Sequence, residues 1–107
     1  MKNWHVVISD PAETDINEIY SYIADTLFEP AAAWRQAERI YNGIFSLSEM
    51  PERCSLLPDE PWRSKGLRRL IVDNYYVIYK IQDDVDTVSV IAVIYGRRDM
   101  TTMDLDV

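Results

Sequence analysis

The sequence predicts an α+β fold with the element order β-α-α-β-β-β, in which an antiparallel-rich sheet carries an N-terminal helix hairpin on one face. Three observations predict it. Apolar side chains recur at helical spacing through residues 11–47, alternation of faces marks residues 67–95 as strands, and a loop with three prolines separates the two regions. The 107 residues are 48% hydrophobic and 27% charged, which fits a single domain over residues 1–107 with one modest core.

The first strand is expected over residues 4–9, which are bulky and β-branched. Asp10 is expected to cap the following helix, with Pro11 in its first turn. Apolar side chains then recur every three or four residues through residues 11–27. The polar residues between them are expected on the solvated face of this helix; they are Glu13, Asp15, Asn17, Glu18 and Asp25.

The second helix is expected over residues 30–49, between Pro30 and Pro51. The short link before Pro30 predicts an antiparallel hairpin of the two helices. Gly43 inside the second helix costs about 1 kcal/mol against Ala, so we expect close packing at that position. The aromatic stripe of the hairpin is expected in the core; it consists of Tyr20, Trp34, Tyr41 and Phe45.

After the loop at residues 51–66, strands are expected over Leu67–Val72, Tyr75–Ile81 and Thr87–Tyr95, with turns at residues 73–74 and 83–84. The last strand is almost entirely apolar, so it is expected in the centre of the sheet. In the middle strand, alternation places Tyr75 and Tyr79 on one face, and Tyr76 and Lys80 on the other. Tyr76 is either part of a polar-aromatic patch with nearby arginines or an ordinary cross-strand packing residue.

The formal net charge of −7 argues against a non-specific nucleic-acid binder. Residues 1–62 carry 4 basic and 11 acidic residues, whereas residues 63–107 carry 7 of each. The basic residues of the second part gather in two places, first Arg63, Lys65, Arg68 and Arg69, and then Arg97 and Arg98. A local basic patch on an acidic protein is therefore expected.

The chain lacks the residues that most catalytic mechanisms require. The lone His5 is in a strand, the lone Cys54 is expected to be an inert free thiol, and the few glycines form no phosphate-binding loop. Residues 83–86 lack the Gly and Glu of a calcium loop. We therefore expect no cofactor and no metal. With no signal peptide and no membrane-spanning segment, a cytoplasmic protein is expected.

Seven segments, in order along residues 8–99, resemble the RelE/ParE superfamily of type II toxin–antitoxin toxins, and in particular its ParE-like "plasmid stabilization" branch. The segments are Ile8–Pro11, Ile19–Ile23, Glu29–Ala32, Met50–Arg53, Leu67–Leu70, Asn74–Tyr79 and Val93–Asp99. Each motif is weak alone, but together, on the predicted element order, they are strong.

The resemblance implies a small toxin that is held silent by a cognate antitoxin. A ParE-like toxin would arrest growth by binding DNA gyrase, with Arg68, Arg69, Arg97 and Arg98 as target-binding residues. It would not bind DNA directly without its antitoxin. The antitoxin segment is expected beside the helix hairpin and the sheet, with its apolar side chains buried there.

The resemblance leaves two alternatives open. A RelE-like toxin would be a metal-independent endoribonuclease that cuts mRNA on the ribosome, with Arg98 and Arg69 at the phosphate, Lys80 assisting and Tyr76 as proton carrier. Here Tyr76 occupies the place of that branch's key arginine, and Asp104 lies near the place of its C-terminal tyrosine, which favours the ParE-like branch. The other alternative is an inactive remnant that serves only as an antitoxin-bound co-repressor.

Overall fold

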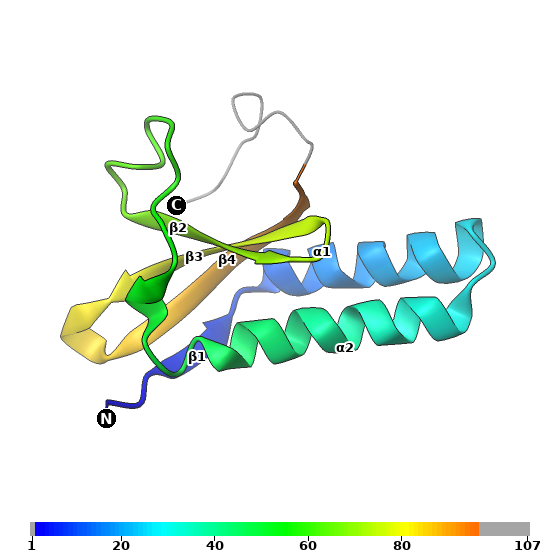
Figure 1. Cartoon of the computed structure of the whole chain (residues 1–107), viewed down its shortest axis with the longest axis horizontal. Helices are drawn as coiled ribbons and strands as arrows, with labels where there is room; N and C mark the ends of the chain where they lie inside the picture. Colours follow the sequence, from blue (N-terminus) through cyan, green and yellow to red (C-terminus); the bar gives the residue numbers. More distant parts are fainter. Residues whose placement is uncertain (1, 97–107) are drawn as a thin grey trace.

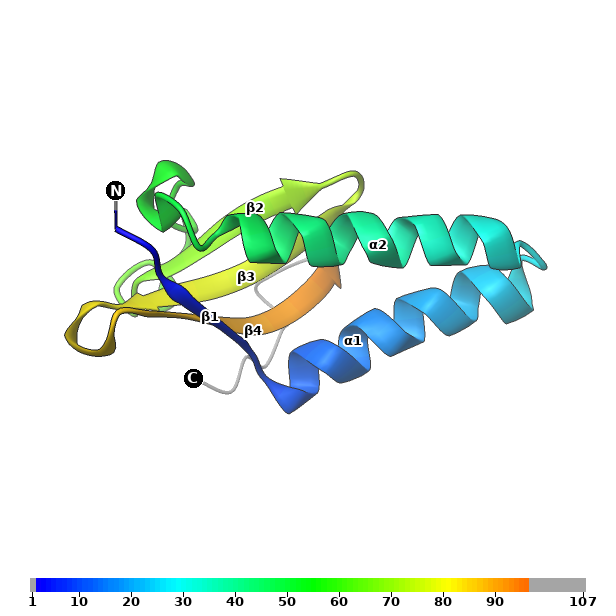
Figure 2. The same ribbon diagram turned by 90° about the horizontal axis from the view of Figure 1, so that it is seen from below.

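The protein is described here by a computed structural model of residues 2–96; residue 1 and residues 97–107 lie outside the described part. Its helices and strands are β1 (His5–Ile8), α1 (Asp10–Ser21), α2 (Pro30–Ser46), β2 (Leu67–Val72), β3 (Tyr75–Gln82) and β4 (Thr87–Tyr95). The sheet has the order β1-β4-β3-β2, with β1 parallel to β4 and the other pairs antiparallel. Both helices lie on one face of the sheet and extend beyond its end (Figures 1 and 2). The predicted α+β class and element order are confirmed.

Helix α1 is capped by Ser9, so the expectation that Asp10 is the cap is wrong. Ser9 has an extended backbone, and its hydroxyl oxygen accepts a hydrogen bond from the Ala12 N–H at 3.2 Å. The same hydroxyl donates to the Ile91 carbonyl of β4 at 3.1 Å. A serine can do both because a hydroxyl is donor and acceptor, whereas a carboxylate only accepts. The cap therefore also fastens the start of α1 to the sheet.

Helix α1 also ends earlier than the predicted uninterrupted helix over residues 11–27. Tyr22–Thr26 form a π-helical turn, which closes with a hydrogen bond from the Leu27 N–H to the Tyr22 carbonyl at 3.1 Å. Phe28 follows with a left-handed φ of 56°, and α2 then begins at Pro30 as expected. The wider turn shifts the helical phase after Tyr22, and Leu27, expected on the apolar stripe, is about half exposed.

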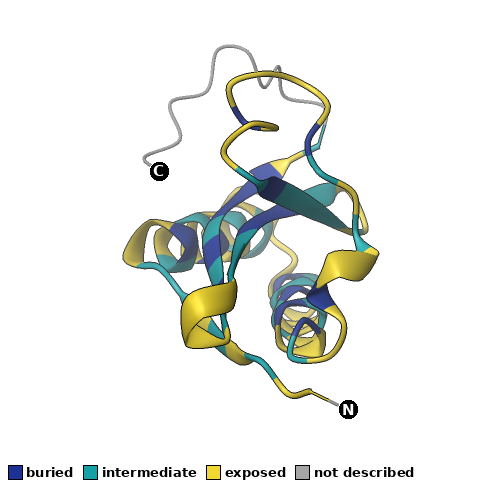
Figure 3. Cartoon of the chain, turned by 90° about the vertical axis from the view of Figure 1, so that its left-hand side faces the viewer, coloured by how far each residue is buried: buried dark blue, intermediate teal, exposed yellow. Residues whose placement is uncertain are grey.

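The main core lies between the helices and the sheet, where Figure 3 shows buried segments of both facing one another. Its buried members are Ala12, Ile16, Ile40, Ile44, Leu47, Val77, Tyr79, Val88, Val90 and Val93. A smaller cluster lies on the opposite face under the loop at residues 55–66; it consists of Leu57, Trp62, Leu67, Ile78, Ala92 and Ile94. The predicted alternation of β3 is thereby confirmed, since Val77 and Ile78 belong to different clusters.

Two further expectations are confirmed by the packing. Strand β4 is central, because it pairs with both β1 and β3. At Gly43, a Cβ atom would lie 2.8 Å from Val72 Cγ2 and 3.3 Å from Leu70 Cδ2, both on β2. The missing side chain thus allows α2 to approach β2 closely.

Two expectations about the hairpin faces are wrong. Trp34 and Phe45 are 64% and 54% exposed, so most of the aromatic stripe is not core. Tyr41 is half-buried, and its hydroxyl donates to Glu13 Oε2 at 2.6 Å. Glu13 and Asp15 are half-buried rather than solvated. The aromatic side chains are exposed because the apolar stripe of the helices is wider and longer than the surface that the sheet covers.

Candidate functional site

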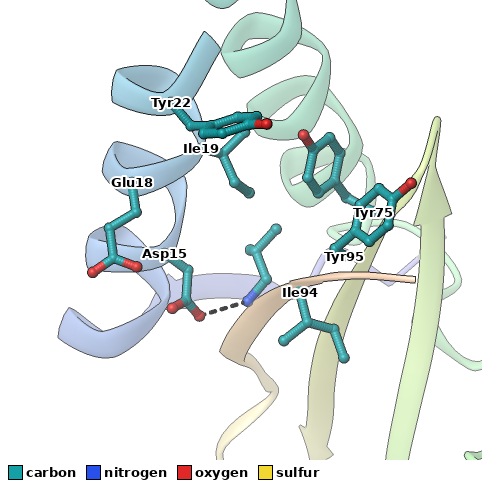
Figure 4. Close-up of a pocket in the computed structure, with 8 residues that line it drawn as sticks. Asp15, Glu18, Ile19, Tyr22, Tyr75, Ile94 and Tyr95 are labelled. Carbon is teal, nitrogen blue, oxygen red and sulfur yellow. Dashed lines mark hydrogen bonds between the residues drawn. The ribbon is translucent and has the colours of Figure 1, made fainter. Parts of the chain in front are cut away.

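A groove opens between α1, the π-helical turn, the start of β3 and the end of β4 (Figure 4). Its volume is about 570 Å³, which is within the range of sites that take a small ligand or a few side chains of a partner. The lining residues are Asp15, Glu18, Ile19, Tyr22, Tyr75, Val93, Ile94 and Tyr95. Aromatic and acidic side chains thus share the walls of one cavity.

The groove exists because β1 is shorter than β4. The register pairs Ile8 with Val90, so β1 leaves the last residues of β4 uncovered on that edge. Asp15 of α1 takes the place of a strand there, and its Oδ2 accepts the Val93 N–H at 2.9 Å (Figure 4). A buried backbone donor needs such an acceptor. Asp15 therefore ties α1 to β4 and forms the floor of the groove.

Three tyrosines surround the opening. Tyr75 and Tyr95 face each other across β3 and β4, with ring centroids 5.9 Å apart in an edge-to-face arrangement. Tyr22 lies on the helical side of the groove (Figure 4). Burial raises the pKa of Tyr75, and the neighbouring Tyr95 and Tyr22 raise it further. The shift moves ionisation of Tyr75 further above physiological pH, where a phenol is already neutral.

The tip of the hairpin, next to the groove, carries exposed apolar side chains. Phe28 is 83% exposed and Trp34 64%, and Tyr22 and Leu27 are about half exposed. Single exposed apolar residues are ordinary, but a cluster of this kind marks an interaction surface. The tip and the groove together form what we call the hairpin surface, defined by Tyr22, Leu27, Phe28 and Trp34 with the groove residues.

The opposite face of the sheet carries a second feature, which we call the Arg69–Tyr76 cluster. The Arg69 guanidinium carbon lies 4.7 Å from the centre of the Tyr76 ring. A Cβ atom at Gly96 would lie 2.7 Å from the same ring, so the ring rests on the glycine backbone. The ring is thus held between a cation and the end of β4. Of the two alternatives that the sequence left open for Tyr76, contact with an arginine is present, and the ring also packs against the smaller apolar cluster.

The structure divides the other predicted site residues between the two faces. Lys80 alternates with Tyr76 along β3 and shares its face. Arg68 lies on the helix-covered face, where its Nη1 donates to the Cys54 carbonyl at 2.6 Å and to the Glu52 carbonyl at 3.3 Å. Arg68 and Arg69 therefore do not form one patch, and Arg68 holds the loop at residues 52–54.

Two residues of the predicted site, Arg97 and Arg98, lie outside the described residues, as does Asp104, which is near the place of the RelE-like branch's C-terminal tyrosine. Conversely, sequence reasoning missed the groove. An unbroken register from the turn at residues 83–84 would pair Tyr75 with Ile94, and only the irregularity between Ile78 and Tyr79 brings Tyr75 opposite Tyr95. Tyr22 follows Glu18 and Ile19 at helical spacing, which places the three on one side of the helix, but nothing in the sequence indicates that this side borders an opening.

The remaining chemical groups are unremarkable in position. Cys54 is half-buried beside Tyr79, whose pKa is raised by burial and then by this neighbouring thiol. Within residues 2–96, no three His, Cys, Asp or Glu side chains gather into a possible metal site. No helix in that range has the length and apolar character needed to cross a bilayer.

Comparison of the sequence with family models gives a match over residues 6–100 to the family described as the ParE toxin of the type II toxin–antitoxin system parDE. No curated protein matches the sequence.

Among solved structures, the chain is similar to a chain of the chromosomal ParDE toxin–antitoxin system from P. aeruginosa. The TM-score is 0.72 at 15% identity, over 89% of this chain and 98% of that chain. It is also similar to a chain of the toxin–antitoxin complex RelBE2 from Mycobacterium tuberculosis, with TM-score 0.64 and 21% identity over 89% and 93%. A mutant of the E. coli toxin RelE in the free state gives TM-score 0.60 and 14% identity over 89% and 85%. At these identities the likeness supports the shared fold.

Proposed function

This chain belongs to the ParE toxin family of type II toxin–antitoxin systems, within the RelE/ParE superfamily, and we propose that it arrests growth by binding a cellular target such as DNA gyrase and is neutralised by a cognate antitoxin. In this role the chain acts by binding rather than by catalysis. Its partners are two proteins, the target and the antitoxin.

The exposed apolar side chains of the hairpin surface carry the antitoxin part of the proposal. They lie on a rigid helix pair beside a groove of about 570 Å³. Amphipathic segments bind such surfaces by placing apolar anchors into a groove. Binding would remove from water side chains that the fold itself leaves exposed.

The Arg69–Tyr76 cluster supports a binding role toward the target. Arginine and tyrosine are enriched at the centres of protein interfaces, and here a stacked pair of them is held on a sheet face. The net charge of −7 opposes docking to RNA, because affinity for RNA depends largely on cationic contacts with phosphates. We therefore place the target contact at Arg69, with Arg97 and Arg98 as the further predicted members.

The same cluster gives the one observation in favour of RelE-like mRNA cleavage. A guanidinium over a phenol, with Lys80 on the same face, could hold a phosphate and deliver a proton. The two functions differ in what they require of Tyr76. Cleavage requires its hydroxyl, whereas binding requires only the ring that supports Arg69.

The test is induced expression in bacteria, with growth followed and the 5′ ends of a cellular mRNA mapped in the same culture. We expect growth arrest with intact messages, and inhibition of gyrase supercoiling by the purified chain. Arg69→Ala should weaken both effects, whereas Arg63→Ala, which removes the same charge from an exposed loop, should not.

Tyr76→Phe separates the two mechanisms. It keeps the ring and removes the hydroxyl, so the binding role predicts unchanged growth arrest. New mRNA ends inside codons, lost by about 10²-fold or more in Tyr76→Phe, would contradict the proposal and establish the endoribonuclease. Normal growth with retained antitoxin binding would also contradict it and support an inactive remnant that acts as a co-repressor.

A further inference from the structure

We propose that the groove accepts a lysine or arginine side chain carried on an apolar segment of the antitoxin. The inference rests on the proposed function, because it states the chemistry of the partner that the hairpin surface binds.

The first argument is the aromatic lining of the groove. Tyr22, Tyr75 and Tyr95 contribute phenol rings from both of its sides (Figure 4). Ring faces attract ammonium and guanidinium groups, and cages built from several rings are a known way to bind cations. The Tyr75 hydroxyl, like any phenol at neutral pH, adds a hydrogen-bonding group without a competing charge.

The second argument is the carboxylate at the rim. Glu18 lines the groove and is exposed, one turn before Tyr22. A cationic side chain held at the rings packs its methylene stem on Ile19 and Val93, and Glu18 adds negative charge at the helical edge of the groove (Figure 4). The groove thus combines an apolar wall for the stem, aromatic rings for the charged head and a carboxylate at its edge.

The third argument is the charge of the surface around the groove. Residues 10–46 contain seven acidic and two basic residues, so the helical region has a formal net charge of −5. One of its two arginines, Arg39, is already paired with Asp73 at 2.7 Å. A cationic partner is therefore steered toward this surface, whereas an acidic segment is repelled.

The same charge argues against a second copy of this chain as the occupant. A symmetric dimer through the groove would bring two surfaces of net charge −5 together. A partner of opposite charge relieves that repulsion. A self-associated form is accordingly one of the outcomes that the experiment must detect.

The experiment measures binding of two fluorescently labelled amphipathic peptides to the purified full-length chain by fluorescence anisotropy. The peptides share their leucine positions and differ only in lysine against glutamate at the polar positions. The protein variants are Glu18→Gln, Tyr22→Leu, their combination, and Glu38→Gln. Glu38 is an exposed acidic residue of α2 that does not line the groove, so Glu38→Gln is the control with the same change of charge.

We expect saturable binding of the lysine peptide and none of the glutamate peptide. Each single groove variant should weaken binding about threefold, the combination about tenfold, and Glu38→Gln less than about twofold. Equal losses in Glu18→Gln and Glu38→Gln would overturn the inference, because they would indicate diffuse charge attraction. So would preferred binding of the glutamate peptide, or a concentration-dependent dimer in sedimentation that Tyr22→Leu abolishes.

Growth arrest by the wild-type chain is measured in parallel, which keeps the two proposals separate. Growth arrest without groove-dependent binding of the lysine peptide refutes only the inference that the partner of the groove is cationic. Absence of arrest refutes the toxin role, whatever the peptides do.

Discussion

The two ends of the helix hairpin carry similar apolar side chains and bury them very differently. At the base, Ile16, Ile40 and Ile44 are at most 1% exposed. At the tip, Phe28 and Trp34 are 83% and 64% exposed. The sheet lies under the base and ends before the tip (Figure 2). The base therefore stabilises the fold, whereas the apolar side chains of the tip are left for a partner.

The largest expected effect is at the base. Ile40→Ala should lower the free energy of unfolding by about 2–5 kcal/mol, because it removes buried methyl groups and leaves a cavity between α2 and the sheet. Urea denaturation followed by circular dichroism measures it. Trp34→Ala at the tip is the matched control, with an expected change within about 0.5 kcal/mol. Similar losses in the two variants would abolish the distinction between base and tip.

A smaller loss is expected where α2 meets β2. Gly43→Ala gains helix propensity of about 1 kcal/mol but places a methyl group 2.8 Å from Val72 Cγ2. We expect a net loss of about 1 kcal/mol in the free energy of unfolding, from the same denaturation measurement. Asn42→Ala, on the exposed side of the helix, should be neutral or slightly stabilising. A gain in stability from Gly43→Ala would show that β2 shifts to accommodate the added methyl group at little cost in free energy.

The Tyr41–Glu13 hydrogen bond joins the two helices, and its effect depends on pH. Burial, together with the hydrogen bond to Glu13 and the charge of its carboxylate, raises the pKa of Tyr41 to about 12. Because this pKa lies above the usual 10.0, the stabilisation is complete below about pH 10 and is lost as the pH rises toward 12.

Tyr41→Phe should cost about 1 kcal/mol at pH 7, and the gap to the wild type should narrow between pH 10 and 12. Paired denaturation curves at pH 7 and pH 11 measure this gap. The other tyrosines titrate in both proteins, so their contributions largely cancel. A gap that is independent of pH would mean that Tyr41 contributes through its ring alone.

The smallest effect is expected at the tip itself. Phe28 has a φ of 56°, which disfavours a side chain and suits glycine. Phe28→Gly should raise the free energy of unfolding by about 0.5 kcal/mol, since relief of backbone strain outweighs the greater conformational freedom that glycine gives the unfolded chain. Phe28→Ala keeps the strain and should leave stability unchanged. Thermal melts compare the two, and destabilisation by either substitution would indicate that Phe28 belongs to the fold.

Several structural features could be predicted from the sequence because they depend on local pattern. Alternation assigned Val77 and Ile78 to different faces, and the apolar run of residues 87–95 marked the central strand. An unfavourable glycine in a helix indicated close packing at Gly43. Alternation alone left open whether Tyr76 meets an arginine or packs across the strands, and the register decided it, because it places Arg69 and Tyr76 on one face of adjacent strands.

The errors arose where burial depends on how far neighbouring elements extend. Trp34 and Phe45 continue an apolar helical stripe, but no strand lies over them. Asp15 belongs to a polar face by its position in the helix, but it accepts a backbone N–H that β1 is too short to reach.

The sequence by itself therefore determined the fold class, the order of the elements and which side of each element is apolar, since these follow from residue order and periodicity, and it determined the family through its resemblance to known members. Only the tertiary structure decided which apolar residues are covered and that a tyrosine-lined groove opens between α1 and β4. Coverage depends on the relative lengths and placement of helices and strands. Periodicity within one element carries no information about where its neighbour ends.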